Sequence, residues 1–462
     1  MHHTDERLGI TPEMLERLSH SRMYSTFLRR MNSIVDSLSV HEARMPNGLR
    51  VLVREDHSAP VVAIYTHVLA GYFDEPDEWT GISHVLEHMY FKGTPTRGPG
   101  VIARETKNAG GYLNASTIYD HTSYYTVLPA ASLAEGLSLQ SDALLNSLID
   151  EEELRKELLV IIQEAKRKLD NSSAFARESL FALLFDNHRM RRWRIGTEDQ
   201  LRTFTRNDVA GFFERFYTTD TITLVVAGDV ETDHVLRLIE DYYRDLRTGT
   251  PLRDRGPAAT APAEFRYREL AGDIVQAQIE IGWHGVPPLH DDTPFLDMLA
   301  LILGQGRASF LYRQVRDAGL ALGIAAYNYA PTELGVFGIS ADTRPADVKA
   351  CVQAIFSTVQ SARSSAITDD DIARAKSVLE ARTIRSLETM EGQANYLAEW
   401  QSFGSWRLGA DYMNRVMNAT RADVVRVAEK YLVPEHAALL CYRPNSAPPV
   451  TATFAELVRH AS

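Results

Sequence analysis

The chain contains very little cysteine. Only Cys351 and Cys441 occur among 462 residues, far apart and outside any C-x-x-C spacing. A disulfide framework needs several cysteines, and a thiolate metal site needs closely spaced pairs. The sequence therefore indicates neither, and we expect two buried thiols in a reducing compartment.

Positively charged residues are also fewer than negatively charged residues. The chain carries 49 Lys and Arg against 61 Asp and Glu, which gives a formal net charge of −12. A field of this sign repels nucleic acid and anionic membrane surfaces, so we expect neither as a partner. A cationic partner or substrate fits the charge better.

Export signals and membrane-spanning runs are missing as well. The N-terminus reads MHHTDERLG, whereas a secretory signal has a basic start followed by about 7–15 apolar residues. Apolar stretches such as FLDMLALILG end at a glycine, well short of the ~18 residues that a membrane helix needs. We expect a cytoplasmic protein.

The remaining sequence has globular composition and two similar halves. Hydrophobic residues make up 45% and charged residues 24%, which excludes a disordered or collagenous chain. Residues 246–265 gain Gly and Pro and lose large apolar residues, as is typical of an interdomain linker. A shift of 215 positions aligns TRNDVAGFFERFY (205–217) with TRADVVRVAEKYL (420–432). The alignment predicts two tandem domains of similar fold.

The hydrophobic periodicity predicts an α+β fold. Strand patterns begin near residue 41, and helical patterns follow, interspersed with further strands in antiparallel hairpins. Spaced apolar residues before the first strand suit short amphipathic helices. The predicted helices cover 81–92, 101–109, 131–148, 151–169 and 206–216. The predicted organisation is an N-terminal helical extension (1–40), an α+β domain (41–245), a linker (246–265) and a second α+β domain (266–462).

One short motif has the composition of a metal site. In GISHVLEHMYFKG, His84 and His88 stand four residues apart, and on a helix both imidazoles project from one face. Such a pair can chelate one zinc ion, and Glu87 on the same side can act as general base toward water. H-x-x-E-H is the inverted zincin motif. Thr80 and Gly93 suit the start and stop of this helix.

A catalytic zinc site usually has a third protein ligand from another element. The predicted helix EEELRKELLVIIQEAKRKLD places Glu157 and Glu164, seven residues apart, on one stripe beside an apolar face. Glu164 is therefore a candidate ligand. Glutamates on charged helices are more often solvated, and this alternative stays open for Glu157. The apolar face consists of Leu154, Leu158, Ile161 and Ile162.

These residues resemble the pitrilysin or insulinase family of zinc peptidases, in the smaller branch that includes the mitochondrial processing peptidase subunits. The resemblance extends over nearly all of residues 41–445. In that family the third ligand is a glutamate about 76 residues after H-x-x-E-H, which is the separation of Glu164 from His88. A supporting glutamate seven residues earlier corresponds to Glu157. The resemblance thus implies one Zn²⁺ per chain and two α+β domains that form half of a clamshell.

The resemblance also implies a substrate-binding strand and an inactive second domain. The segment GGYLNASTIYDHTSYYTVLP is similar to the family's glycine–asparagine segment, whose edge strand pairs with extended substrate. The second half contains a similar glycine-rich loop and an arginine, Arg316. The substrate-pairing positions are Leu113, Asn114 and Ala115. At the shift of 215, the metal-site residues of the first half align with Leu299, Ile302 and Leu303, so the second half has no metal site.

One position departs from the family pattern. Active members carry a tyrosine shortly after the arginine, in a stretch resembling R-x-x-G-L-A-Y, and this chain has Leu322 there. In two-chain members one subunit brings the zinc and the other brings the arginine–tyrosine pair. The chain therefore resembles the zinc-bearing half of a heterodimer, and a homodimer is the less favoured arrangement.

The expected activity is zinc-dependent endoproteolysis of short, unstructured peptides inside a closed chamber. The alternative is a non-catalytic subunit that binds peptide or has a structural role, and its signature would be a damaged motif.

A second open question concerns the acidic loop FDEPDEW. This loop either attracts basic peptides or is a solvated turn. Its acidic residues are Asp74, Glu75, Asp77 and Glu78.

Overall fold

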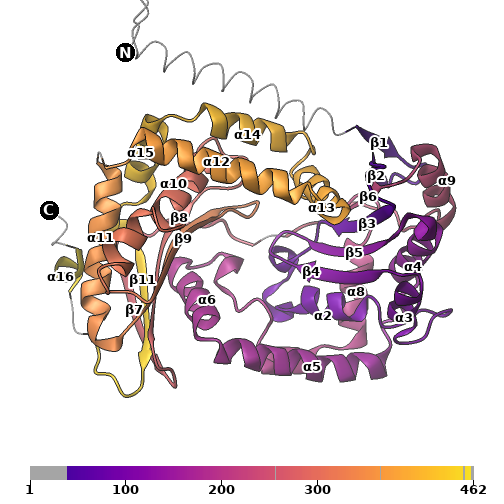
Figure 1. The fold of residues 1–462 in the computed structure, drawn as a ribbon. Helices are drawn as coiled ribbons and strands as arrows, with labels where there is room; N and C mark the ends of the chain where they lie inside the picture. The colour runs from indigo at the N-terminus through magenta and orange to yellow at the C-terminus, as the bar shows by residue number, and fades with distance from the viewer. Residues whose placement is uncertain (1–38, 255, 365, 451–452, 459–462) are drawn as a thin grey trace, which may run out of the picture.

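A computed structural model describes residues 39–450, apart from 255 and 365, and residues 453–458 (Figure 1). The chain forms two halves, each built on one β-sheet, with the long helix α5 (Glu151–Asp170) running along the edge of the molecule. The expected N-terminal extension lies outside the described residues except for positions 39 and 40. No helix in the described part of the chain has both the length and the apolarity to cross a membrane.

The first sheet has six strands in the order β1-β2-β6-β3-β5-β4. Neighbouring strands are antiparallel except β2 and β6, which are parallel. The two outermost strands of this sheet are therefore β1 and β4. The strands are β1 (Val40–Arg44), β2 (Arg50–Glu55), β3 (Val61–Val68), β4 (Tyr112–Thr117), β5 (Thr122–Pro129) and β6 (Ile222–Gly228).

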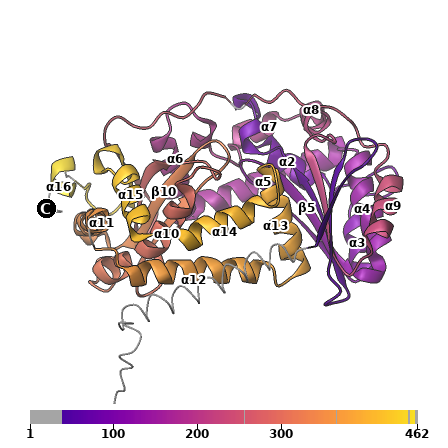
Figure 2. The same cartoon turned by 90° about the horizontal axis from the view of Figure 1, so that it is seen from above.

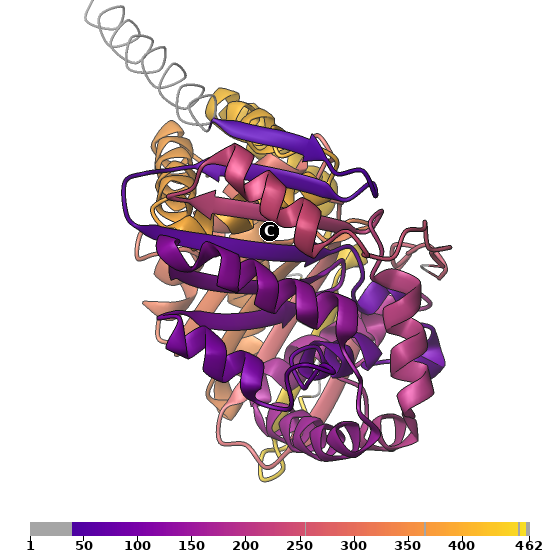
Figure 3. The ribbon, with the colours of Figure 1, turned by 90° about the vertical axis from the view of Figure 1, so that its right-hand side faces the viewer.

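Helices cover the outer face of this sheet. α4 packs on β3 and β5, and α9 packs on β2, and Figure 3 shows the helices laid across the strands. The five helices that periodicity predicts in this half are present, with ends shifted by a few residues. Besides α5, the helices are α2 (Ile82–Met89), α3 (Val101–Asn108), α4 (Leu133–Asn146), α6 (Ser172–Leu184), α7 (Glu198–Thr203), α8 (Arg206–Phe216) and α9 (Thr232–Tyr242).

The second sheet has five strands in the order β7-β11-β8-β10-β9. Only β7 and β11 are parallel neighbours. The strands are β7 (Arg266–Gly272), β8 (Ala277–Gly285), β9 (Gly323–Tyr329), β10 (Gly335–Thr343) and β11 (Ala438–Pro444). The helices are α10 (Thr293–Gly304), α11 (Val348–Arg363), α12 (Asp369–Ser386), α13 (Met390–Ser402), α14 (Leu408–Asn418), α15 (Arg421–Tyr431) and α16 (Phe454–Val458).

The internal repeat is visible at the ends of both halves. α8 and α15 begin with the same capping box, in which the side chain of Thr205 or Thr420 accepts from the backbone of Asp208 or Asp423. Each helix is followed by an apolar strand that joins the middle of its sheet, β6 or β11. The fold class predicted from the sequence is confirmed: both halves are α+β, with sheets in which most neighbouring strands are antiparallel. The domain boundaries stay a prediction.

Each half also contributes a helix to the sheet of the other half. α13 packs on β3 and β6 of the first sheet, and α6 packs on β8 and β11 of the second (Figure 2). Leu397 of α13 is completely buried in one apolar cluster with Leu52 and Val225. Leu180 of α6 is likewise buried with Val336. Because each core is completed by the other half, neither sheet is fully covered without the whole chain.

This exchange predicts that the chain unfolds as one unit. We expect Leu397→Ala to lower the free energy of unfolding by about 2–5 kcal/mol, because it leaves a cavity between the halves. Scanning calorimetry should show a single unfolding transition at a lower midpoint temperature than in the wild type. The control is Val275→Ala, at a side chain that is 87% exposed, and it should leave the midpoint unchanged. Two separate transitions, only one of them sensitive to Leu397→Ala, would contradict the shared core.

Candidate metal centre

The helix that carries H-x-x-E-H is held at its N-terminus by a buried carboxylate. Glu75 is completely buried, and its two oxygens accept from the backbone N–H groups of Gly81 and Ser83, each at 2.9 Å. Gly81 has φ +98°, and a Cβ there would lie 2.5 Å from the carbonyl oxygen of Ile195. Only glycine fits this position.

The predicted limits of this helix are therefore wrong by a few residues. α2 begins at Ile82 after Gly81, and the hydroxyl of Thr80 donates to the carbonyl of Asp77 (2.9 Å) instead of capping the helix. The helix ends at Met89, before Gly93. Thr80 does not cap the helix, because the carboxylate of Glu75 already accepts hydrogen bonds from the free backbone N–H groups at the N-terminus of α2.

His84, His88 and Glu164 converge on one point. His84 Nε2 lies 3.8 Å from Glu164 Oε1, and His88 Nε2 lies 3.6 Å from Glu164 Oε2. One ligand atom from each residue lies within 4.8 Å of the others. Two imidazole nitrogens and one carboxylate oxygen form the three-ligand donor set of a catalytic zinc site. The structure thus brings together the three residues that the sequence nominates as ligands.

Glu157 determines which nitrogen of His88 is free. His88 Nδ1 lies 3.1 Å from Glu157 Oε2, so Nδ1–H donates to the carboxylate and Nε2 keeps its lone pair toward Glu164. Lys92 pairs with the other oxygen of Glu157. Burial opposes ionisation of Glu157, but the hydrogen bonds from Lys92 and His88 prevail and lower its pKa. Glu157 therefore supports His88 and is not a solvated surface residue.

His84 is also in the form that binds a metal. Burial, followed by the neighbouring His88, lowers the pKa of His84 to about 3, so its imidazole is neutral at physiological pH. The two rings lie 4.7 Å apart, edge to face. A neutral imidazole with an accessible lone pair is what a divalent cation such as zinc requires. On these grounds the residues present fit the ion.

Glu87 lies on the same helix and contacts the first sheet. The hydroxyl of Thr117 donates to Glu87 Oε2 at 2.5 Å. Burial raises the pKa of Glu87 above its ordinary value, although the bond from Thr117 opposes the shift. A carboxylate with a raised pKa beside a metal site is suited to exchange a proton with water near neutral pH.

The predicted substrate strand is an edge strand. β4 includes Leu113, Asn114 and Ala115, and among the described strands it pairs only with β5. The N–H of Ala115 donates to Oδ1 of the adjacent Asn114 (2.9 Å). Thr117, at the end of the same strand, contacts Glu87. An exposed edge that leads to the metal site can accept an added strand.

Arg316 lies away from these residues in the second half. Its guanidinium stacks over the ring of Tyr312 at 4.7 Å, and its Nε donates to the carbonyl of Leu322 (3.1 Å). Leu322 itself is 47% exposed. These contacts keep Arg316 in its own turn, and none of them involves the metal-binding group. The residues aligned with the metal site, Leu299, Ile302 and Leu303, are completely buried in the second core.

The acidic loop is not a solvated turn throughout, and its attraction for basic peptides stays a prediction. Asp77 and Glu78 are exposed, but Asp74 and Glu75 are buried. Asp74 pairs with Arg253 of the segment between the halves (2.8 Å). Sequence reasoning missed the role of Glu75, because no local feature of the loop distinguishes this glutamate from the exposed Glu78.

Comparison with known proteins assigns the chain to a family. Residues 50–198 match the family described as "Insulinase (Peptidase family M16)". Residues 203–379 match the domain described as "Peptidase M16 inactive domain". The first match contains the metal-binding group, and the second contains the buried leucine and isoleucine positions aligned with it.

Curated and structural relatives agree with these matches. An uncharacterized zinc protease of Rickettsia felis is 27% identical, over 84% of this chain and 94% of its own length. A probable mitochondrial-processing peptidase subunit beta of Arabidopsis thaliana is 25% identical, over 89% of this chain and 80% of its own. The crystal structure of a protease from Helicobacter pylori has a similar fold, with a TM-score of 0.83 at 23% identity over 88% of this chain and all of that one. The chain belongs to the insulinase family of metallopeptidases, peptidase family M16.

Proposed function

We propose that the protein is a zinc-dependent endopeptidase that cleaves extended, unstructured peptides. The observation that carries the proposal is the convergence of His84, His88 and Glu164 beside Glu87. When bound, zinc would supply Lewis-acid chemistry: it would polarise the scissile carbonyl and lower the pKa of water, which makes water a better nucleophile near neutral pH.

The residues of the chain would bind the metal, transfer the proton and orient the general base. His84, His88 and Glu164 would hold the ion, and Glu157 fixes the tautomer of His88. Glu87 takes a proton from the attacking water on its carboxylate and passes it to the nitrogen of the leaving amine. The hydroxyl of Thr117 holds one oxygen of Glu87 in place, which orients the carboxylate for this transfer.

Substrate would bind by strand addition along β4. Main-chain hydrogen bonds to Leu113, Asn114 and Ala115 give affinity with little demand on sequence. Because the peptide must be extended to pair in this way, folded proteins are excluded. Enclosure between two bilobed subunits would limit access further.

The partner that closes this chamber is, in our proposal, a homologous subunit. The position that carries tyrosine in active relatives is Leu322 here, so the arginine–tyrosine pair is incomplete in this chain. A second subunit that supplies the pair would complete the site, and the chain would be the zinc-bearing half of a heterodimer. A homodimer lacks a source for the tyrosine.

Glu87→Gln tests the activity. We expect the variant to keep its zinc and to lose cleavage of an unstructured peptide mixture by at least about 100-fold, because the general base is removed. The protein is best isolated from its native cells with any subunit that co-purifies, and the products are identified by mass spectrometry.

The matched control in this experiment is Glu78→Gln, which changes an exposed glutamate. Undiminished cleavage by Glu87→Gln would remove Glu87 from the mechanism, and a zinc-loaded wild type that yields no products would contradict the peptidase. A wild type that is fully active as a self-dimer would overturn the heterodimer and leave the peptidase intact.

Glu157→Gln tests the support of His88. Loss of the carboxylate charge should weaken zinc binding by about 10–100-fold, the usual effect of removing such a partner. Competition with a chelator measures the affinity. Glu152→Gln, on the same helix but 58% exposed at its side chain, should leave the affinity unchanged. Equal affinities for both variants would show that Glu157 is dispensable.

Glu75→Ala tests the cap of the metal-binding helix. Two buried N–H groups lose their acceptor, which should lower the free energy of unfolding by about 2 kcal/mol and weaken zinc binding as well. Denaturant unfolding of the metal-free protein separates the two effects. We expect the exposed Glu78, changed to Ala, to alter stability by less than about 0.5 kcal/mol. A stable Glu75→Ala protein with normal zinc affinity would contradict the cap.

A further inference from the structure

A second threonine hydroxyl lies behind the one that contacts Glu87. Thr117 and Thr122 pair with each other at the turn between β4 and β5, and their hydroxyl oxygens lie 3.3 Å apart. Thr122 is 1% exposed, and its hydroxyl donates to the carbonyl of the completely buried Ala70 (2.9 Å). A row of polar groups therefore runs from Glu87 through both hydroxyls to a backbone carbonyl just after β3.

One segment of the chain contacts both this turn and the metal-binding helix. The backbone N–H of Phe73 donates to the carbonyl of Tyr119 in the turn between β4 and β5 (2.9 Å). A Cβ on Gly71 would lie 2.3 Å from the carbonyl oxygen of Ile118, so the two backbones are in direct contact. The same segment continues to Glu75, which caps α2. It therefore fixes both the acceptor carbonyl and the helix that carries the general base.

The direction of each hydrogen follows from what its partner can do. A threonine hydroxyl has one hydrogen to donate and two lone pairs that accept. The carbonyl of Ala70 only accepts, so the hydrogen of Thr122 points to it and a lone pair is left toward Thr117. While Glu87 is ionised, the hydrogen of Thr117 points to its carboxylate. In this state neither hydroxyl has a hydrogen for the 3.3 Å contact between them.

The hydrogen of Thr117 can reverse when Glu87 carries a proton. The carboxylic acid then has an O–H of its own, and a lone pair of Thr117 lies 2.5 Å away to accept it. Thr117 can turn its hydrogen to Thr122 Oγ1, whose lone pair is the acceptor in this direction. The two threonines therefore give Glu87 a hydrogen-bond partner both before and after it takes a proton.

We propose that Thr122 is a positioning residue for the general base and acts through Thr117. Its hydroxyl, held on the carbonyl of Ala70, accepts from Thr117 while Glu87 carries the proton of the attacking water. The carboxyl group thus keeps one orientation between taking that proton and releasing it to the leaving amine. The threonine hydrogens only change direction, and no proton leaves the pair. The inference rests on the proposed peptidase activity.

A double-mutant cycle on the zinc-loaded protein, with any subunit that co-purifies, tests the proposal. Thr122→Val keeps the shape of the side chain and removes its hydroxyl, so we expect kcat to fall about tenfold with KM for peptide unchanged. Thr122→Ser restores the hydroxyl and should restore most of kcat. In a Thr117→Val background, Thr122→Val should have no further effect, because the residue through which it acts is gone. Zinc affinity, measured by competition with a chelator, should stay at the wild-type value.

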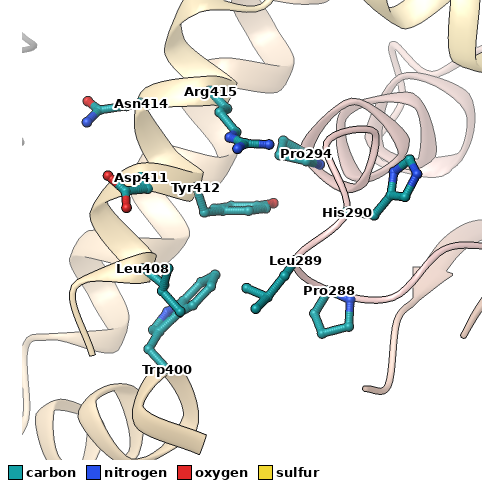
Figure 4. A pocket seen from close by; sticks show the side chains of 10 residues that line it. All are labelled: Pro288, Leu289, His290, Pro294, Trp400, Leu408, Asp411, Tyr412, Asn414 and Arg415. Atoms are coloured by element: carbon teal, nitrogen blue, oxygen red, sulfur yellow. The ribbon is translucent and has the colours of Figure 1, made fainter. Parts of the chain in front are cut away.

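Two buried hydroxyls outside this row serve as controls. Thr343 is completely buried in the second half, and its hydroxyl donates to the carbonyl of Leu320 (2.6 Å). Tyr412 lines a groove of about 540 Å³ between α14 and the loop before α10 (Figure 4). Its hydroxyl donates to Asp297 (2.6 Å). Thr343→Val and Tyr412→Phe each remove a hydrogen-bonded hydroxyl, and both should keep the wild-type kcat.

The outcomes separate this inference from the proposed function. An active wild type with unchanged kcat in Thr122→Val, or valine effects that multiply in the double variant, would overturn the role of Thr122 and leave the peptidase intact. Weaker zinc binding or a raised KM in Thr122→Val would assign the residue to the fold of the site and overturn its positioning role too. A wild type without activity contradicts the proposed function itself, and the inference fails with it.

Discussion

The packing of α2 against α5 is the constraint on which the site depends. The two helices share one core: Val85, Leu86 and Met89 of α2 are completely buried with the apolar face of α5. That packing fixes the register between the helices, and with it the distances of 3.6 and 3.8 Å that join the two histidines to Glu164. A metal site built on packed helices loses little conformational entropy when the ion binds, because its ligands are already in position.

The halves are bound to each other more closely than a linker alone would allow. α6 and α13 each complete the core of the opposite half, and Arg253 of the intervening segment pairs with Asp74. Asp74 is next in sequence to Glu75, which caps α2. The position of the metal-binding helix is thus coupled to the segment between the halves.

Much of this structure can be predicted from the sequence, because periodicity and spacing are local. The helices over 101–109, 151–169 and 206–216 follow from their apolar stripes, and the motif places His84 and His88 on one face. Glu164 needs more than periodicity, since its distance to the histidines depends on how two helices pack, and the family resemblance supplies that information. Glu75 could not be predicted, because nothing local distinguishes a buried capping carboxylate from its exposed neighbour Glu78. The exchange of α6 and α13 is likewise tertiary and leaves no sequence signal.

The coordination of zinc by this chain is the most direct test of the account. X-ray absorption spectroscopy at the zinc edge, on the protein loaded with one equivalent, reports the ligand types. The account predicts two imidazole nitrogens with the remaining ligands oxygen, and loss of this spectrum in Glu164→Ala. A spectrum with one imidazole or none, or one unchanged by Glu164→Ala, would contradict the assignment of His84, His88 and Glu164 as the metal centre.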